Sequence, residues 1–304
     1  MQNQKYDAWL HWYINMRCNL NCAYCFFNLL KKRAKLKSVD TKKIVKTLDE
    51  TGKVFRIYLT GGGEPFLVRN IIELCEGITK KHYLFINSNL TSNKFKDFAR
   101  KINPERVLGI HASLHIEELL KKNLVDKYVE NYHILKEKGF TIFSVAIAYP
   151  PLLEKVDEYY RFFQKKGILF YYEPYYGNFL GKKYPYSYTP EEISAFHLKN
   201  ACKNTFNQKN KICNAGYNVA IVAGNGNIYP CVNIYQNLGN IYKKIQFNDQ
   251  LIKCPVKSCA CPLNQYDISL FKKSLENKNI NTKIHNGLVN YIGQLIVYAN
   301  IEFS

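Results

Sequence analysis

Short apolar runs alternate with amphipathic stretches of helical length along the first 175 residues, a pattern typical of a βα protein with a parallel sheet. The apolar runs predict strands at 8–15, 54–59, 83–87, 107–112, 141–148 and 168–172. The stretches between them predict helices at 41–51, 71–80, 94–101, 124–138 and 153–165. Six such units fall short of the eight that close a TIM barrel, so we expect an α/β fold with an open, partial (β/α)6 barrel. In such folds the chemistry lies at the carboxyl ends of the strands.

The character of the chain changes near residue 200. A segment rich in Tyr, Gly and Pro (174–190) leads into a short predicted helix at 191–199. Beyond it, small loops, Gly-Asn turns and cysteines replace the βα pattern. We therefore expect a barrel domain over 1–199, a small Cys-rich domain over 200–265 and a partly helical tail over 266–304.

Composition excludes several classes of protein. Hydrophobic residues make up 47% of the 304 residues, which excludes a globally disordered chain. No stretch approaches the roughly 20 uncharged apolar residues of a membrane helix, so we expect no membrane partner. Residues 1–7 are polar and lack the apolar run of a signal peptide, which favours a cytoplasmic location.

The formal net charge is +19, and much of the excess is concentrated in eight Lys and Arg residues between positions 31 and 46. Such a patch fits either a nucleic-acid or phosphorylated partner or a solvated face of a lysine-rich protein. Aromatic residues do not interleave with these charges as they do in single-strand binders, which favours the solvated face.

The placement of the cysteines is more informative than their number. The chain has ten: Cys18, Cys22, Cys25, Cys75, Cys202, Cys213, Cys231, Cys254, Cys259 and Cys261. In a cytosolic chain, clustered thiols of this kind usually bind metal rather than form disulfides.

The first cysteine group has the spacing Cys18-x3-Cys22-x2-Cys25, in the loop after the first strand. One short loop can bring three thiolates onto three irons of a cubic iron–sulfur cluster and leave the fourth iron open to a substrate or cofactor. A structural zinc site would normally need a fourth ligand, and no His or Cys lies close enough in sequence to supply it.

These features resemble the radical S-adenosylmethionine (radical SAM) superfamily, in the same order along residues 8 to about 175. Tyr24 stands just before the third cysteine, where that family usually has an aromatic residue. The segment 62–65 matches the Gly-Gly-Glu-Pro motif after the second strand, and 87–89 (Asn-Ser-Asn) resembles the family's Thr-Asn-Gly turn, with two residues replaced. Ser113 and His115 are the polar residues that follow the fourth strand.

The resemblance implies a mechanism and its cofactors. S-adenosylmethionine would chelate the open iron of a 4Fe-4S cluster, accept one electron and give a 5′-deoxyadenosyl radical that removes a hydrogen atom from the substrate. A reductant such as flavodoxin or ferredoxin would supply the electron. The backbone of 62–64 would hold the methionyl amine, and Tyr24 would lie near the adenine. The cofactor-binding residues implied are Tyr24, Gly62, Gly63, Glu64, Asn87, Ser88, Asn89 and Ser113.

The second cysteine group resembles the auxiliary-cluster extension called SPASM in full and twitch when shortened. Residues 218–223 and 228–229 predict a hairpin that brings Cys213 and Cys231 together. The thiols are too few for two further clusters, so the resemblance implies a single auxiliary 4Fe-4S cluster. Its ligands would be Cys213, Cys231 and two of three cysteines, namely Cys254, Cys259 and Cys261. Structural zinc is the rival metal for the same thiolates.

Three further residues have open roles. Cys202 is either a spare thiol or a hydrogen-atom donor that quenches a substrate radical. His115 is either a proton acceptor for a substrate hydroxyl or amine or a supporting residue. Cys75 has helical spacing with apolar neighbours and is expected in the core.

We therefore expect a radical SAM enzyme of the oxidoreductase or epimerase type. Its substrate would be a small molecule or a peptide. A small molecule is favoured because the first strand begins at residue 8 and leaves no room before it for a peptide-recognition domain. The alternative is a non-catalytic, metal-stabilised protein that binds nucleic acid.

Overall fold

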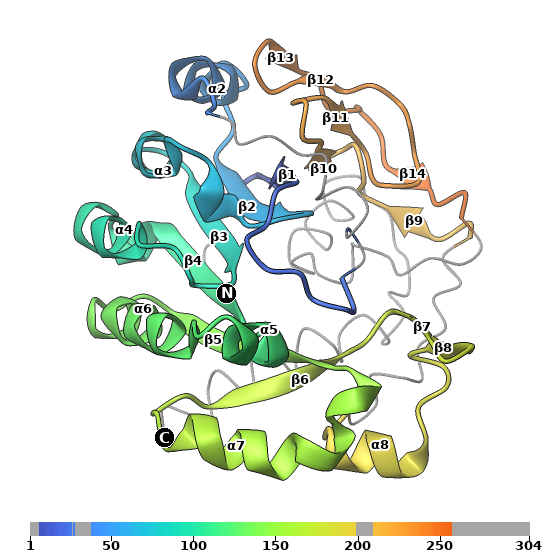
Figure 1. Ribbon diagram of the computed structural model, residues 1–304. Helices are drawn as coiled ribbons and strands as arrows, with labels where there is room; N and C mark the ends of the chain where they lie inside the picture. The colour runs from blue at the N-terminus through green and yellow to red at the C-terminus, as the bar shows by residue number, and fades with distance from the viewer. Residues whose placement is uncertain (1–5, 26, 28–37, 199–208, 257–304) are drawn as a thin grey trace, which may run out of the picture.

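The computed structural model describes residues 6–25, 27, 38–198 and 209–256. Its centre is a sheet of eight strands in the order β11-β10-β1-β2-β3-β4-β5-β6 (Figure 1). Strands β1 to β6 are parallel, and their sequence order equals their spatial order. The partial barrel expected from the sequence is thereby confirmed. The six strands are β1 (Ala8–Asn15), β2 (Phe55–Gly61), β3 (Tyr83–Ser88), β4 (Val107–Ser113), β5 (Ile142–Ala148) and β6 (Phe170–Pro174).

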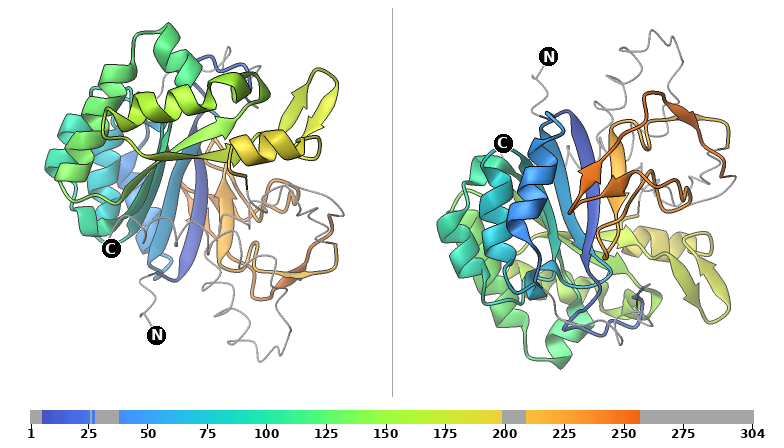
Figure 2. Two further views of the ribbon diagram at one scale, coloured as in Figure 1. Left: turned by 90° about the horizontal axis from the view of Figure 1, so that it is seen from below. Right: turned by 90° about the horizontal axis from the view of Figure 1, so that it is seen from above.

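Helices follow the strands and cover the outer face of the sheet (Figure 2). Each buries apolar residues at helical spacing against the strands, as Ile44 and Leu48 of α2 do. The side chain of Asp40 caps that helix by accepting a hydrogen bond from the backbone N–H of Lys43. The helices are α2 (Thr41–Asp49), α3 (Ile71–Thr79), α4 (Phe95–Lys101), α5 (Ile116–Lys121), α6 (Val125–Glu137), α7 (Val156–Gln164) and α8 (Pro190–Ala195), with 3-10 turns at η1 (Pro65–Leu67), η2 (Pro104–Arg106) and η3 (Pro150–Lys155).

The structure differs from the sequence predictions in a few places. Helix α5 was not predicted, because its six residues are too few to show a helical period. The predicted helix at 153–165 begins instead as the 3-10 turn η3, since two prolines open it. The segment after β6, predicted as a linker, contains the hairpin of β7 (Gly177–Phe179) and β8 (Lys182–Tyr184).

The segment after residue 209 adds to the central sheet. The predicted hairpin forms from β10 (Val219–Val222) and β11 (Ile228–Tyr229), which pair antiparallel. Strand β10 also pairs parallel with β1, so the sheet continues past its first strand. The same segment contains four more short strands: β9 (Ile212–Cys213), β12 (Gly239–Asn240), β13 (Lys244–Ile245) and β14 (Ile252–Lys253). The predicted tail at 266–304 lies outside the described residues.

Among the described residues, no helix combines the length and the apolar character needed to cross a bilayer.

Candidate active site

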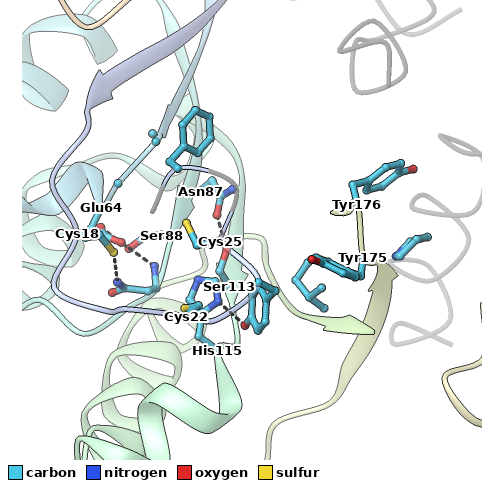
Figure 3. Close-up of a pocket in the computed structure, with 18 residues that line it drawn as sticks. Cys18, Cys22, Cys25, Glu64, Asn87, Ser88, Ser113, His115, Tyr175 and Tyr176 are labelled. Carbon is cyan, nitrogen blue, oxygen red and sulfur yellow. Dashed lines mark hydrogen bonds between the residues drawn. The ribbon is translucent and has the colours of Figure 1, made fainter. Parts of the chain in front are cut away.

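The carboxyl ends of the parallel strands surround a cavity of about 270 Å³. Figure 3 shows Cys18, Cys22 and Cys25 on one side of it, with Tyr175 and Tyr176 across from them. Every residue of the barrel that the sequence singled out for the cluster or the cofactor contributes to its wall: Cys18, Cys22, Tyr24, Cys25, Gly62, Gly63, Glu64, Asn87, Ser88, Asn89, Ser113 and His115. Residues far apart in sequence therefore meet at one place, as expected for the carboxyl edge of such a sheet.

The cysteine loop is held in shape by backbone hydrogen bonds. The Cys18 sulfur accepts a hydrogen bond from the backbone N–H of Leu20 at 3.4 Å. The N–H of Cys25 donates to the carbonyl of Cys22 at 3.1 Å. The side-chain amide of Asn89, at the end of β3, lies 3.9 Å from the same Cys18 sulfur and donates to Asn19 at 3.0 Å. Hydrogen bonds to a ligand sulfur are one of the means by which proteins set the potential of iron–sulfur clusters.

The glycine turn after β2 packs directly against the start of the cysteine loop. A Cβ atom on Gly63 would lie 2.1 Å from the backbone oxygen of Arg17, a distance that no side chain tolerates. The N–H of Gly63 donates to the carbonyl of Asn15 at 3.0 Å, and that of Glu64 donates to the carbonyl of Arg17 at 2.8 Å. Glycine is therefore required because two backbones approach each other closely here.

The side chain of Asn15 adds a third connection between these segments. Its amide donates to the carbonyls of Glu64 and Arg17, both at 2.9 Å. Asn15 was not among the predicted site residues. The signal was present, because Asn15 is the polar residue that ends an otherwise apolar strand at the carboxyl edge.

Glu64 joins the glycine turn to the end of β3. Its carboxylate accepts hydrogen bonds from Phe66 N–H at 2.9 Å, from Ser88 Oγ at 2.8 Å and from Asn89 N–H at 2.8 Å (Figure 3). Burial raises the pKa of Glu64 to about 7, and the three hydrogen bonds limit that rise. The side chain thus fixes two turns that both face the cavity.

Two further polar pairs line the cavity. Ser113 Oγ donates to Asn87 Oδ1 at 2.6 Å, which joins the ends of β4 and β3. The Tyr24 hydroxyl and His115 Nδ1 are hydrogen-bonded at 2.8 Å, so the cysteine loop is linked to the residue that precedes α5. Burial and the nearby Cys22 raise the pKa of Tyr24 well above its ordinary value, which keeps its hydroxyl protonated.

The second cysteine group is described in part. Strands β9 and β14 pair antiparallel, and Cys254 N–H donates to Lys211 O at 2.9 Å, so Cys213 at the end of β9 lies near Cys254, which directly follows β14. The sulfurs of Cys213 and Cys231 each accept a backbone N–H from the second residue after them, at 3.4 Å, as Cys18 does. Three of the predicted residues, Cys202, Cys259 and Cys261, lie outside the described residues.

The residues around the first cysteine group suit an iron–sulfur cluster. Three cysteines, none of them in a disulfide, line one cavity that has room for a larger group. In the described part of the chain, no three His, Cys, Asp or Glu side chains gather tightly enough to hold a single metal ion. Cys75 lies in the core on α3, as expected.

Comparison with known proteins agrees with this arrangement. The model of the radical SAM superfamily matches residues 12–163, which is half of the chain. No curated protein gives a significant match. Similar solved structures include native anSMEcpe with bound AdoMet, which is 18% identical with a TM-score of 0.54 over 78% of each chain. Another is Streptococcus suis SuiB, which is 18% identical with a TM-score of 0.51 over 81% of this chain and 66% of that one.

These low identities support a shared fold only, whereas the family model matches half of the chain, including the three-cysteine loop and the glycine turn. The chain belongs to the radical SAM superfamily.

Proposed function

We propose that this chain binds a 4Fe-4S cluster through Cys18, Cys22 and Cys25 and uses S-adenosylmethionine to remove a hydrogen atom from its substrate. The observation that carries the proposal is that one cavity is lined by these three cysteines, by the glycine turn and by the polar ends of β3 and β4. When bound, the cluster supplies the electron that splits S-adenosylmethionine into methionine and a 5′-deoxyadenosyl radical.

The chain's own residues position the cofactor in this proposal. The backbone at Gly62 and Gly63, fixed by hydrogen bonds to 15–17, faces the methionyl amine. Tyr24, held by His115, provides an aromatic surface for the adenine. The linked side chains of Asn87 and Ser113 offer hydrogen bonds to the ribose or the carboxylate. The aromatic wall at Tyr175 and Tyr176 limits access of water from the opposite side.

The auxiliary site is a second part of the proposal. Cys213, Cys231 and two of three thiols (Cys254, Cys259 and Cys261) would hold one further 4Fe-4S cluster. The hydrogen bonds to the sulfurs of Cys213 and Cys231, which match the one at Cys18, support this assignment. Such a cluster would accept an electron from the substrate radical in an oxidation, or bind the substrate.

Two classes of substrate fit the proposal. A solved structure shows SuiB bound to the precursor peptide SuiA, which supports a peptide substrate for a chain of the same fold. The small volume of the cavity beside the cysteines supports a small molecule or a single side chain as the substrate. The electron would come from a small redox protein such as flavodoxin or ferredoxin.

The test is anaerobic reconstitution of the full chain and of the triple variant C18A/C22A/C25A. We expect the variant to lose about half of the iron, because one of two four-iron clusters is removed, and to lose all production of 5′-deoxyadenosine. Cys75→Ala is the matched control, since Cys75 is buried in α3 away from the cavity, and it should keep both. Undiminished cleavage of S-adenosylmethionine by the triple variant would refute the proposed function.

A further inference from the structure

One carboxyl on the inner face of the barrel has no role in the site described above. Glu173 lies on β6, where it pairs in register with Ile147 of β5. Side chains of register partners in parallel strands point to the same face of a sheet. Ile147 lines the cavity, and so do Pro174 and Tyr175 immediately after Glu173. The Glu173 side chain therefore points into the barrel next to Ile147 of the cavity wall, although Glu173 is not itself one of the residues that line the cavity.

Among the residues that the structure describes, none places a positive charge beside Glu173 to balance it. Within the described part of the chain it has neither a hydrogen-bond nor an ion-pair partner. Burial alone raises its pKa to about 7. His11 and His111, which share the inner face, are uncharged, because burial lowers their pKa values to about 3 and about 4. The charge of Glu173 is felt by Tyr58, whose pKa it helps to raise.

Glu64 provides the contrast. Burial raises the pKa of both carboxyls to about 7. Glu64, however, accepts hydrogen bonds from three donors within the protein. Glu173 is half-buried, and a carboxylate withdrawn from most of its solvent without a partner is costly to keep, so it is usually retained where a ligand completes it.

The lack of basic residues in the cavity wall also favours a positively charged ligand. The chain carries 43 Lys and Arg residues, yet none of them is among the described residues that line this cavity. Aromatic rings form part of its wall instead, including Tyr175 and Tyr176. Aromatic faces beside a carboxylate are a typical arrangement for binding an ammonium group, and Glu173 adjoins this wall between Ile147 and Tyr175.

We infer that Glu173 binds a positively charged amine of the substrate at the inner face of β5 and β6. This inference rests on the proposed function and specifies that its substrate carries an amine. The amine of S-adenosylmethionine is a separate group, because the proposal places it at the turn after β2, four strands away from β6 in the sheet. An ammonium group at Glu173 would stabilise the ionised carboxylate and hold the rest of the substrate beneath the reacting centre.

The test uses the reconstituted full chain with S-adenosylmethionine and two simple probes, n-butylammonium and n-butanol. Binding of both is measured by ligand-observed NMR. We expect the unaltered chain to bind butylammonium more tightly than butanol. Glu173→Gln should weaken the binding of butylammonium at least tenfold, which corresponds to about 1.4 kcal/mol, and leave the binding of butanol unchanged. Glu117→Gln is the control for general attraction of cations, since Glu117 is an exposed acid on α5. It should change butylammonium binding less than twofold.

Three outcomes would overturn the inference. The first is an unaltered chain that shows no preference for butylammonium, a result that needs no variant and does not depend on how a variant folds. The second is a folded Glu173→Gln chain that still prefers it. The third is a Glu173→Gln chain that loses affinity for S-adenosylmethionine instead. Iron–sulfur absorbance and 5′-deoxyadenosine are measured in the same samples, so failure of the proposed function is seen separately.

Discussion

At the scale of single residues, Glu64 shows how the fold and the site depend on the same atoms. Its carboxylate is buried among three donors that belong to two different turns. A glutamine at this position keeps the size of the side chain but presents an amide N–H₂ to at least one of those donors, so one hydrogen bond is lost.

The raised pKa of Glu64 predicts how stability depends on pH. Between its ordinary pKa of 4.5 and the folded value of about 7, the folded chain keeps a proton that the unfolded chain has released. Stability attributable to this group is therefore highest below pH 4.5, falls as the pH rises towards 7 and is constant above. From pH 5 to pH 8 the unaltered chain should lose about 2 kcal/mol more than Glu64→Gln, measured as the free energy of unfolding in urea.

The control for this prediction is Glu105→Gln, at an exposed carboxyl in η2. It should follow the unaltered chain at both pH values. Equal pH dependence in the Glu64→Gln chain and the unaltered chain would show that Glu64 does not carry the buried proton.

At the scale of elements, the turn after β2 provides a matched pair of glycines. A Cβ atom on Gly63 meets the backbone of Arg17 at 2.1 Å, whereas one on Gly62 meets the terminal methyl of Met16 at 2.2 Å. The methionine side chain can move aside, but the backbone cannot move without shifting the cysteine loop. Gly63→Ala should therefore cost about 2–3 kcal/mol of folding free energy and abolish binding of S-adenosylmethionine, while Gly62→Ala costs less than about 1 kcal/mol.

Calorimetric titration with S-adenosylmethionine and urea unfolding of both variants check this prediction. Equal losses in the two variants would mean that the turn is not fixed by its contact with the cysteine loop.

The same scale shows what local sequence can reveal. The first strand was predicted with its observed bounds, because an apolar run that ends in a polar residue marks a buried strand and its carboxyl end. The cysteine loop and the glycine motif were predicted to share a site, and one cavity contains both. The hydrogen bond between Tyr24 and His115 was beyond local patterns, because it joins residues 91 positions apart. Helix α5 was missed because it is shorter than two turns and offers little periodicity.

At the scale of the whole molecule, the position of β10 links the segment after residue 209 to the barrel that carries the first cysteine group. The sequence predicted β10 as half of a local hairpin, and its pairing with β11 confirms that. Its parallel pairing with β1 was not predicted, since a short apolar run indicates a buried strand but not its partner. Through this pairing the segment after residue 209 covers the edge of the strand that leads into the cysteine loop.

This arrangement predicts that damage to β10 reaches the first cysteine group. Ala220 is fully buried and lies in register with Leu10 of β1. Ala220→Asp places a carboxyl without a partner in the apolar core beside Leu10, at a cost on the order of 3 kcal/mol. We expect this variant to lose iron at Cys18, Cys22 and Cys25 and to lose cleavage of S-adenosylmethionine, although the substitution lies far along the chain. Asn225→Asp introduces the same residue at an exposed position in the turn after β10 and preserves the oxygen that accepts from Asn227 N–H, so it should retain both. If Ala220→Asp lost only the iron of the second cysteine group, the two groups would belong to independent modules, and β10 would contribute nothing to the barrel that holds the cofactor.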